Sequence, residues 1–288
     1  MYLFIQAAFL GVIQGLTEFI PISSSAHLVI VPWLFKWHNP ALTSLPFDVA
    51  LHLGTLAAIV FFFASDWARL IRAGFASIVE RKIGDAPDRK LAWMLIIGCV
   101  PGALVGALAE HKIEKLFHQP AMPMRVSALI AMAVIIAMLA AVLFIVERVT
   151  NHVREMKSLS FKDAIIIGCA QAFAIFPGVS RSGATITAGL AMGLKRDSAA
   201  RFSFLLSAPI IAGAGLKSLH EVMKELHTHA LCASDLTLFA VGGLTAAVSG
   251  FLCIKFLLRF LQKNSTDPFV YYRWALAATI IVVALTRG

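Results

Sequence analysis

The sequence predicts an all-α protein that crosses a membrane several times. Of its 288 residues, 59% are hydrophobic and 14% are charged, and the mean hydropathy is +0.82. Soluble domains carry about 25% charged residues, and a single soluble core stops growing near this chain length, so that a soluble protein could not bury so much apolar surface. Composition therefore excludes a soluble enzyme, a disordered chain and a disulfide scaffold.

Six apolar segments have the length of a transmembrane helix, which needs about 20 residues to cross the bilayer. Within the last of them, residues 269–285 contain a single charged residue, Arg273. The predicted spans are 47–65, 91–110, 126–146, 199–218, 236–258 and 269–287.

Two further apolar regions, 2–35 and 164–194, are interrupted in the middle by proline, serine and charged residues. Irregular backbone at membrane depth is tolerated only where protein buries it or where it lines a wet cavity, and broken helices mark binding sites in membrane proteins. We expect each region to form a re-entrant hairpin.

The interrupted regions also resemble each other. Gly11-x-x-Gln14 returns 157 residues later as Gly168-x-x-Gln171, and in both copies a proline and a serine cluster follow. This indicates an internal duplication with repeats at 1–150 and 158–288 in one integral membrane domain, each repeat being one re-entrant hairpin and three spans. Because three is odd, the two repeats are expected to insert with inverted topology.

The charges predict the orientation of the chain. In this topology sixteen Lys and Arg residues fall on the side of segments 66–90, 147–163, 195–201 and 255–268, and seven fall on the other. Cytoplasmic loops carry the excess of Lys and Arg, so both termini should face the periplasm and the hairpin tips should meet near the midplane. This orientation explains the net charge of +9. Binding to nucleic acid is not expected, because the sequence has no basic patch interleaved with aromatic residues.

Ionisable and hydroxyl side chains crowd the two interruptions. Within a bilayer, Glu18, His27 and Arg181 each cost several kcal/mol unless they are paired or wet. A structural Glu18–Arg181 ion pair is one interpretation. The other is an anion cradle of Arg181, hydroxyls and backbone N–H groups at helix N-termini. The candidate cradle residues are Gln14, Ser23, Ser24, Ser25, Gln171, Ser180, Ser182 and Thr185.

Three residues of the first interruption have the types needed for covalent chemistry. Ser24, His27 and Glu18 could supply a nucleophile, a proton carrier and an orienting carboxylate. Attack by Ser24, attack by His27 and activation of water by His27 all stay open at this point. Asp48 and His52, four residues apart, form either an end-of-helix pair or a support to this site. The scattered cysteines show no CxxC spacing, which argues against disulfides and zinc.

Residues 14–27 and 176–185 resemble the two signature motifs of the bacterial undecaprenyl-diphosphatase family of the bacitracin-resistance type, and 47–55 and 202–209 are also similar to family sequence. The resemblance implies a multi-pass inner-membrane hydrolase that removes one phosphate from a C55 polyprenyl diphosphate lipid. That reaction recycles the lipid carrier of peptidoglycan synthesis and confers bacitracin resistance.

The same resemblance implies functions for particular residues. Glu18, Ser24, His27 and Arg181 match the essential set of the family, and the hydrolysis is expected to depend on a divalent cation, Mg²⁺ or Ca²⁺. Gln14 is the Gln variant of a position occupied by Glu or Gln, so the first motif here brings one carboxylate. Because the carrier is released as a diphosphate outside the cytoplasm, the site is expected to open to the periplasm.

A transporter is the alternative interpretation. Inverted repeats with broken helices are typical of secondary transporters, and a polyprenyl-phosphate flippase would use the same anion cradle. A carrier needs Arg181 but not Ser24 and His27 together. A different class of polyprenyl phosphatase has a His six residues after its Ser-Arg pair, where this chain has Thr187. The oligomeric state stays open, a homodimer included.

Overall fold

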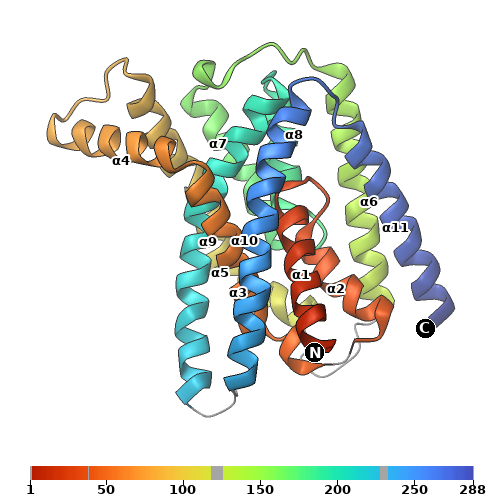
Figure 1. Ribbon diagram of the computed structural model, residues 1–288. Coiled ribbons are helices and arrows are strands. Elements are labelled where there is room, and N and C mark those ends of the chain that lie inside the picture. Colours follow the sequence, from red (N-terminus) through yellow and green to blue (C-terminus); the bar gives the residue numbers. More distant parts are fainter. Residues whose placement is uncertain (1, 38, 118–125, 228–232, 288) are drawn as a thin grey trace.

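The computed structural model describes residues 2–37, 39–117, 126–227 and 233–287 (Figure 1). Throughout these ranges the regular elements are helices, in agreement with the predicted class. The α-helices are α1 Tyr2–Phe19, α2 Ser24–Phe35, α3 Leu45–Phe62, α4 Ala64–Val79, α5 Pro87–Phe117, α6 Val126–Val149, α7 Phe161–Ala172, α8 Arg181–Ala191, α9 Arg196–His227, α10 Ala233–Leu261 and α11 Asp267–Arg287. The short 3-10 helices are Pro40–Thr43, Met156–Ser158 and Phe173–Ile175.

Seven of the described helices are long and apolar enough to cross a membrane. Six of them, α3, α5, α6, α9, α10 and α11, coincide with the six predicted spans. The seventh is α1, which the sequence assigns to the first hairpin. The predicted end of the first span at 65 is wrong, because α3 stops at Phe62 and the chain turns at Phe63 into another helix.

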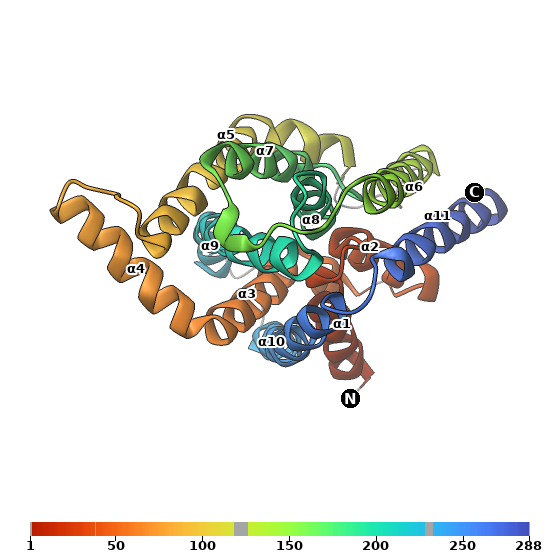
Figure 2. The ribbon, with the colours of Figure 1, turned by 90° about the horizontal axis from the view of Figure 1, so that it is seen from above.

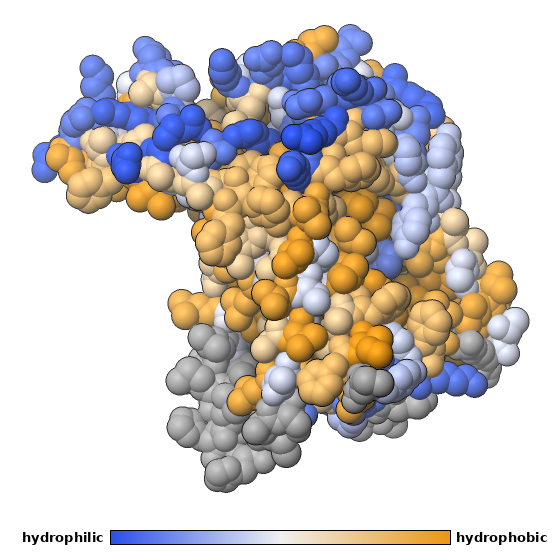
Figure 3. All heavy atoms as spheres, viewed as in Figure 1, coloured by the Kyte–Doolittle hydropathy of each residue, from blue (hydrophilic) through white to orange (hydrophobic). Residues whose placement is uncertain are grey.

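That additional helix, α4, projects sideways from the bundle (Figures 1 and 2). Its exposed apolar residues include Ile71, Phe75 and Ile78. In the space-filling view the projecting arm is hydrophilic above and more apolar below (Figure 3). A helix with one apolar and one polar face is typical of an interfacial element that lies along a bilayer surface. From the sequence, this stretch is expected only as part of the charged segment 66–90.

The polar connections of the bundle share one end. In Figure 1, α4, the α6–α7 connection and the α10–α11 turn all lie at the upper end, whereas α1 begins and α11 finishes towards the lower end. Figure 3 shows hydrophilic residues gathered over this upper end, above a broad apolar belt. We call it the charged end. The segments predicted to share a side of the membrane therefore do lie together.

Glycines bring the broken helices close to their neighbours. α1 packs on α10 and α7 packs on α5. A Cβ atom at Gly11 would lie 2.3 Å from the carbonyl oxygen of Gly242, and one at Gly168 would lie 2.3 Å from that of Gly98. Small residues allow such close backbone approach between membrane helices. This packing holds α1 and α7 in place, and the breaks that follow them are buried at residues 21–23 and 177–180.

Candidate active site between the two broken helices

The two breaks end in the same local backbone shape. Ser23 caps α2 with a φ of 76°, and Ser180 caps α8 with a φ of 67°. Each serine hydroxyl accepts a backbone N–H of its own helix, from Ala26 at 3.4 Å and from Gly183 at 3.1 Å. Left-handed backbone is costly for a residue with a side chain and persists where the surroundings hold it. Both breaks therefore turn the chain sharply and point a helix N-terminus into the bundle.

Glu18, at the end of α1, is the centre of the site and is only 7% exposed. Its Oε2 atom accepts a hydrogen bond from the Ser24 hydroxyl at 2.7 Å and another from Gln14 Nε2 at 3.0 Å. Arg181 Nη2, from the second break, donates to Glu18 Oε1. His52 Nε2 lies 3.8 Å from Oε2. The predicted proximity of Glu18 and Arg181 is thus present in the structure, and Ser24 shares the same carboxylate.

His27 is close in sequence but points away from this carboxylate. Its Nδ1 atom lies 2.6 Å from the carbonyl oxygen of Ser23, and its Nε2 atom lies 2.7 Å from the Tyr272 hydroxyl. Because a carbonyl can only accept, Nδ1 carries a proton and donates this bond, and a ring with one proton then accepts from Tyr272 through Nε2. None of the described hydrogen bonds joins His27 to Ser24 or Glu18. The structure therefore assembles a Ser24–Glu18 pair without the predicted histidine between them.

The histidine beside the carboxylate is His52 of α3. Its Nδ1 atom bonds to the main-chain oxygen of Asp48 at 2.8 Å, which leaves Nε2 facing Glu18. The contact between Asp48 and His52 runs through the main chain of Asp48, and of the two residues it is His52 that faces the Glu18 carboxylate.

Arg273 joins the two breaks and is 1% exposed. It donates to the carbonyl oxygen of Pro21 in the first turn and to those of Gly178 and Val179 in the second, each at 3.3 Å. A Cβ at Gly183 would lie 2.8 Å from Arg273 Nη1, so a side chain at this position would have to displace the guanidinium. The sequence identifies Arg273 as a charged residue within the last span. No sequence pattern indicates the partners of Arg273 or the contact between Tyr272 and His27.

The remaining hydroxyls tie the second break to its surroundings. Ser182 Oγ donates to the carbonyl oxygen of Ile20 at 3.2 Å, and it lies 3.3 Å from Ser180 Oγ. Thr185 Oγ1 lies 2.6 Å from Ser203 Oγ of α9. In the first break, Ser25 Oγ lies 3.3 Å from Ser23 Oγ, and Ser25 is exposed.

Gln171 is not part of the cluster around Glu18. It is 3% exposed, and neither of its amide atoms has a partner among the described residues. A Cβ at Gly102 of α5 would lie 3.3 Å from its Nε2 atom. Its counterpart Gln14 bonds to Glu18 through Nε2 but keeps a buried Oε1 without a partner. The duplicated glutamine therefore faces the carboxylate in one repeat only.

The described residues contain no group of three or more His, Cys, Asp or Glu side chains that could hold a metal ion by themselves. The site does offer oxygen donors on two residues that bond to each other, the Glu18 carboxylate and the unpartnered Oε1 atom of Gln14. Mg²⁺ is commonly held by one or two protein oxygens together with substrate phosphates. The residues present therefore fit a hard divalent cation that arrives with a phosphorylated ligand.

Comparison with known proteins agrees with this chemistry. Residues 7–279 match the family described as bacitracin resistance protein BacA. The chain is 45% identical to the undecaprenyl-diphosphatase of Thermomicrobium roseum over 96% of its own length and 97% of that protein. It is 43% identical to the undecaprenyl-diphosphatase of Caldicellulosiruptor bescii over 98% of both chains. It is also 44% identical to undecaprenyl-diphosphatase 2 of Stutzerimonas stutzeri over 97% of both.

Proposed function

The chain belongs to the bacitracin resistance protein BacA family, and we infer from this membership that it is an undecaprenyl-diphosphatase. It hydrolyses undecaprenyl diphosphate to undecaprenyl phosphate and inorganic phosphate, which returns the lipid carrier to peptidoglycan synthesis and is consistent with a role in bacitracin resistance. The observation in the structure that best supports this reaction is the hydrogen bond of 2.7 Å from Ser24 to Glu18, with Arg181 on the other carboxylate oxygen.

In the mechanism that this geometry favours, Ser24 is the nucleophile. Its Oγ attacks the terminal phosphorus while Glu18 takes the hydroxyl proton. The bond between that phosphorus and the bridging oxygen breaks, and undecaprenyl phosphate leaves. Water then attacks the phosphorus of the phosphoserine, inorganic phosphate leaves with the oxygen of that water, and Glu18 returns its proton to the Ser24 oxygen. His27 holds the α2 break against α11 through Tyr272.

Arg181 is the group that binds the diphosphate. A guanidinium has five N–H donors, and one of them is used by Glu18. The others can take phosphate oxygens in pairs and offset the charge that develops during phosphoryl transfer. Backbone N–H groups at the N-termini of α2 and α8 add donors for the same anion. Arg273 keeps both turns in register by bonding to their carbonyl oxygens.

A divalent cation, Mg²⁺ or Ca²⁺, would be held by Glu18 and the Oε1 atom of Gln14 together with the phosphate oxygens of the substrate. When bound, the ion would neutralise charge on the phosphates. Removal of divalent ions with a chelator should then weaken substrate binding in the wild type. A Gln14→Ala variant should need a higher ion concentration for half-maximal activity, whereas an unchanged requirement would remove Gln14 from the ion site.

The arrangement of helices supports two inverted repeats that meet at this site. The packing of α1 on α10 is matched by that of α7 on α5, as a two-fold relation between the repeats requires. In Figure 1, α1 enters from the lower end and α7 from the charged end. With the charged end in the cytoplasm, the hairpin bearing Glu18 and Ser24 enters from the periplasmic side of the inner membrane, and the diphosphate reaches the site from there.

Phosphate release by the purified protein tests the reaction. In detergent and without any gradient, the wild type should release phosphate from labelled undecaprenyl diphosphate, and Glu18→Gln should abolish release while retaining the substrate. The matched control is Glu155→Gln, which changes an exposed carboxylate paired with Lys195 and should keep wild-type rates. Tight binding of the substrate by the wild type without phosphate release would support a carrier instead.

Cysteine labelling tests the orientation. In a cysteine-free background, Asp85→Cys, between α4 and α5, should react with an impermeant maleimide only after spheroplasts are opened. A cysteine introduced at Tyr2 should react in intact spheroplasts. The reverse pattern would place the charged end in the periplasm and contradict the proposed access route.

A further inference from the structure

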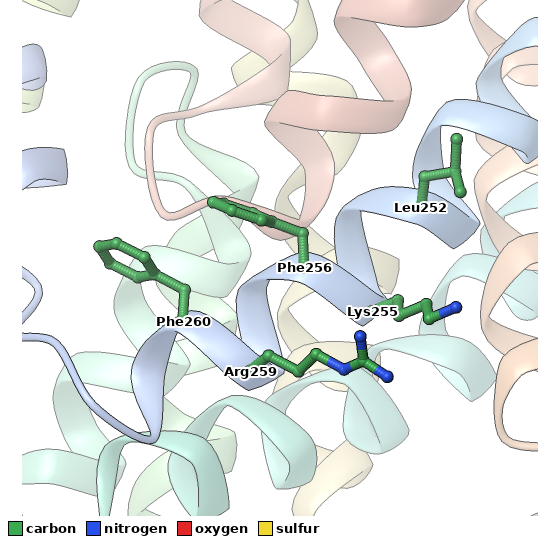
Figure 4. A pocket seen from close by; sticks show the side chains of 5 residues that line it. All are labelled: Leu252, Lys255, Phe256, Arg259 and Phe260. Atoms are coloured by element: carbon green, nitrogen blue, oxygen red, sulfur yellow. The ribbon is translucent and has the colours of Figure 1, made fainter.

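A groove lies on the outer surface of α10 near its charged end, away from the candidate active site. It has a volume of about 410 Å³ and is lined by Leu252, Lys255, Phe256, Arg259 and Phe260. Figure 4 shows Lys255 and Arg259 reaching the same way from successive turns of the helix. Phe256 and Phe260 stack beside them with ring centroids 5.7 Å apart. The groove thus combines a cationic edge with aromatic walls.

The two cations are not neutralised by the protein. Among the described residues, the side chains of Lys255 and Arg259 have no hydrogen-bond or ion-pair partner, although other cations of the charged end do. Arg148 pairs with Asp267, and Arg201 pairs with Asp66. Both Lys255 and Arg259 are exposed. Two adjacent like charges repel each other, so this edge favours an anion as its partner.

An apolar track continues below the cations. Leu244, Val248, Leu252 and Phe256 are exposed and spaced by four residues, so they follow one side of α10. Such a track suits an acyl chain lying along the helix. Lys255 lies six residues before the end of α10 at Leu261, which is about 9 Å along the helix axis. The cations therefore sit beside the apolar surface and not in a loop beyond it.

The position of α4 gives an independent mark for the membrane surface. α3 ends at Phe62, α4 begins at Ala64, and Phe62 packs edge-on against Phe251 of α10 with ring centroids 5.4 Å apart. Lys255 is one helical turn beyond Phe251, and so lies close to the level at which α4 leaves the bundle. Because α4 has the form of an interfacial helix, this level corresponds to the lipid headgroups.

From these observations we propose that the groove binds an acidic phospholipid of the leaflet at the charged end. Its headgroup phosphate would lie between Lys255 and Arg259, and an acyl chain would follow the track from Phe256 to Leu244. Basic pockets at the ends of transmembrane helices are suited to anionic headgroups. The proposal does not depend on which side of the membrane the charged end faces or on the reaction.

Native mass spectrometry of the detergent-purified protein tests this proposal. It would be titrated with dioleoyl phosphatidylglycerol and with dioleoyl phosphatidylcholine, which differ in net headgroup charge but not in acyl chains. The wild type should bind the anionic lipid at least about tenfold more tightly. Lys255→Gln/Arg259→Gln should abolish this preference, and the single variants should each reduce it.

The matched control is Lys157→Gln/Lys162→Gln, which removes the same charge from the same end at exposed positions away from α10. It should keep the preference. Equal binding of both lipids by the wild type, or a preference that survives in the α10 variant, would overturn the proposal. Displacement of phosphatidylglycerol from the groove by undecaprenyl diphosphate at lower concentration, in the Ser24→Ala background, would also overturn it, because the occupant would then be the substrate. Phosphate release by the α10 variant in detergent should match the wild type, which separates this test from that of the reaction.

Discussion

The first hairpin, α1 and α2, and the second hairpin, α7 and α8, share a backbone design but differ in chemistry. Ser23 and Ser180 cap the second helix of each with a left-handed backbone. At the offset of 157 residues, however, Glu18 corresponds to Ile175, and Ser24 corresponds to Arg181. The first hairpin carries the acid and the hydroxyl that donates to it, and the second carries the cation that bonds to the acid.

This difference indicates how a duplicated membrane hairpin can form an asymmetric site. The shared features, glycines against a neighbouring helix and a serine cap at the break, shape the backbone. The divergent positions place opposite charges where the two breaks meet, so that each stabilises the other inside the bilayer. The comparison predicts that catalytic substitutions act unequally on the two hairpins, whereas packing substitutions act alike.

The largest expected effect is in the first hairpin. Ser24→Ala should lower kcat/KM at least about 1000-fold, which is about 4 kcal/mol, because it removes the attacking oxygen. Ser182→Ala, in the second hairpin, should lower it less than about tenfold, since that hydroxyl bonds to the carbonyl of Ile20. Steady-state phosphate release by both variants measures the contrast. Equal losses in the two variants would contradict the assignment of the nucleophile to the first hairpin.

The packing of the two hairpins should respond symmetrically. Gly11→Ala and Gly168→Ala each place a Cβ only 2.3 Å from a carbonyl oxygen of the neighbouring helix. Each substitution should destabilise the protein by about 1–3 kcal/mol. Gly106→Ala in α5, whose Cβ would meet nothing within 4 Å, is the control and should show no loss. Thermal unfolding in detergent gives the comparison. A loss confined to one hairpin would contradict the shared packing design.

Arg181→Lys should lower kcat/KM at least roughly tenfold, about 1.4 kcal/mol, because an ammonium cannot bind two phosphate oxygens in the paired geometry of a guanidinium. The control is Arg148→Lys, which keeps charge at an exposed pair with Asp267 and should retain wild-type kinetics. Wild-type turnover by a folded Arg181→Lys protein would exclude the paired contact with substrate.

The smallest effect is expected at the support of the first hairpin. Tyr272→Phe removes the hydroxyl that bonds to His27 and keeps the ring that stacks on it, so kcat/KM should fall about threefold to tenfold. Tyr271→Phe changes the neighbouring exposed tyrosine and should have no effect on the same assay. If the two substitutions give equal rates, the Tyr272 hydrogen bond does not position the active site.

The sequence by itself determined the helical membrane class and the six spans, because apolar runs of this length have no other stable structure in water or lipid. It also indicated both breaks and singled out Glu18, Ser24 and Arg181, since polar side chains within apolar sequence are costly unless they are paired or wet. Local pattern is enough for these conclusions because each depends on residues close together in the chain.

The partners of those residues were decided by the tertiary structure. Tyr272 and Arg273 reach the breaks from α11, more than two hundred residues after Glu18, and His52 reaches the carboxylate from α3. The sequence placed His27 with Ser24 by their spacing of one helical turn, yet helix packing directs its ring to α11. Side-chain direction across a helix bundle depends on how the helices rotate against one another, and that rotation is set by contacts such as those at Gly11 and Gly168.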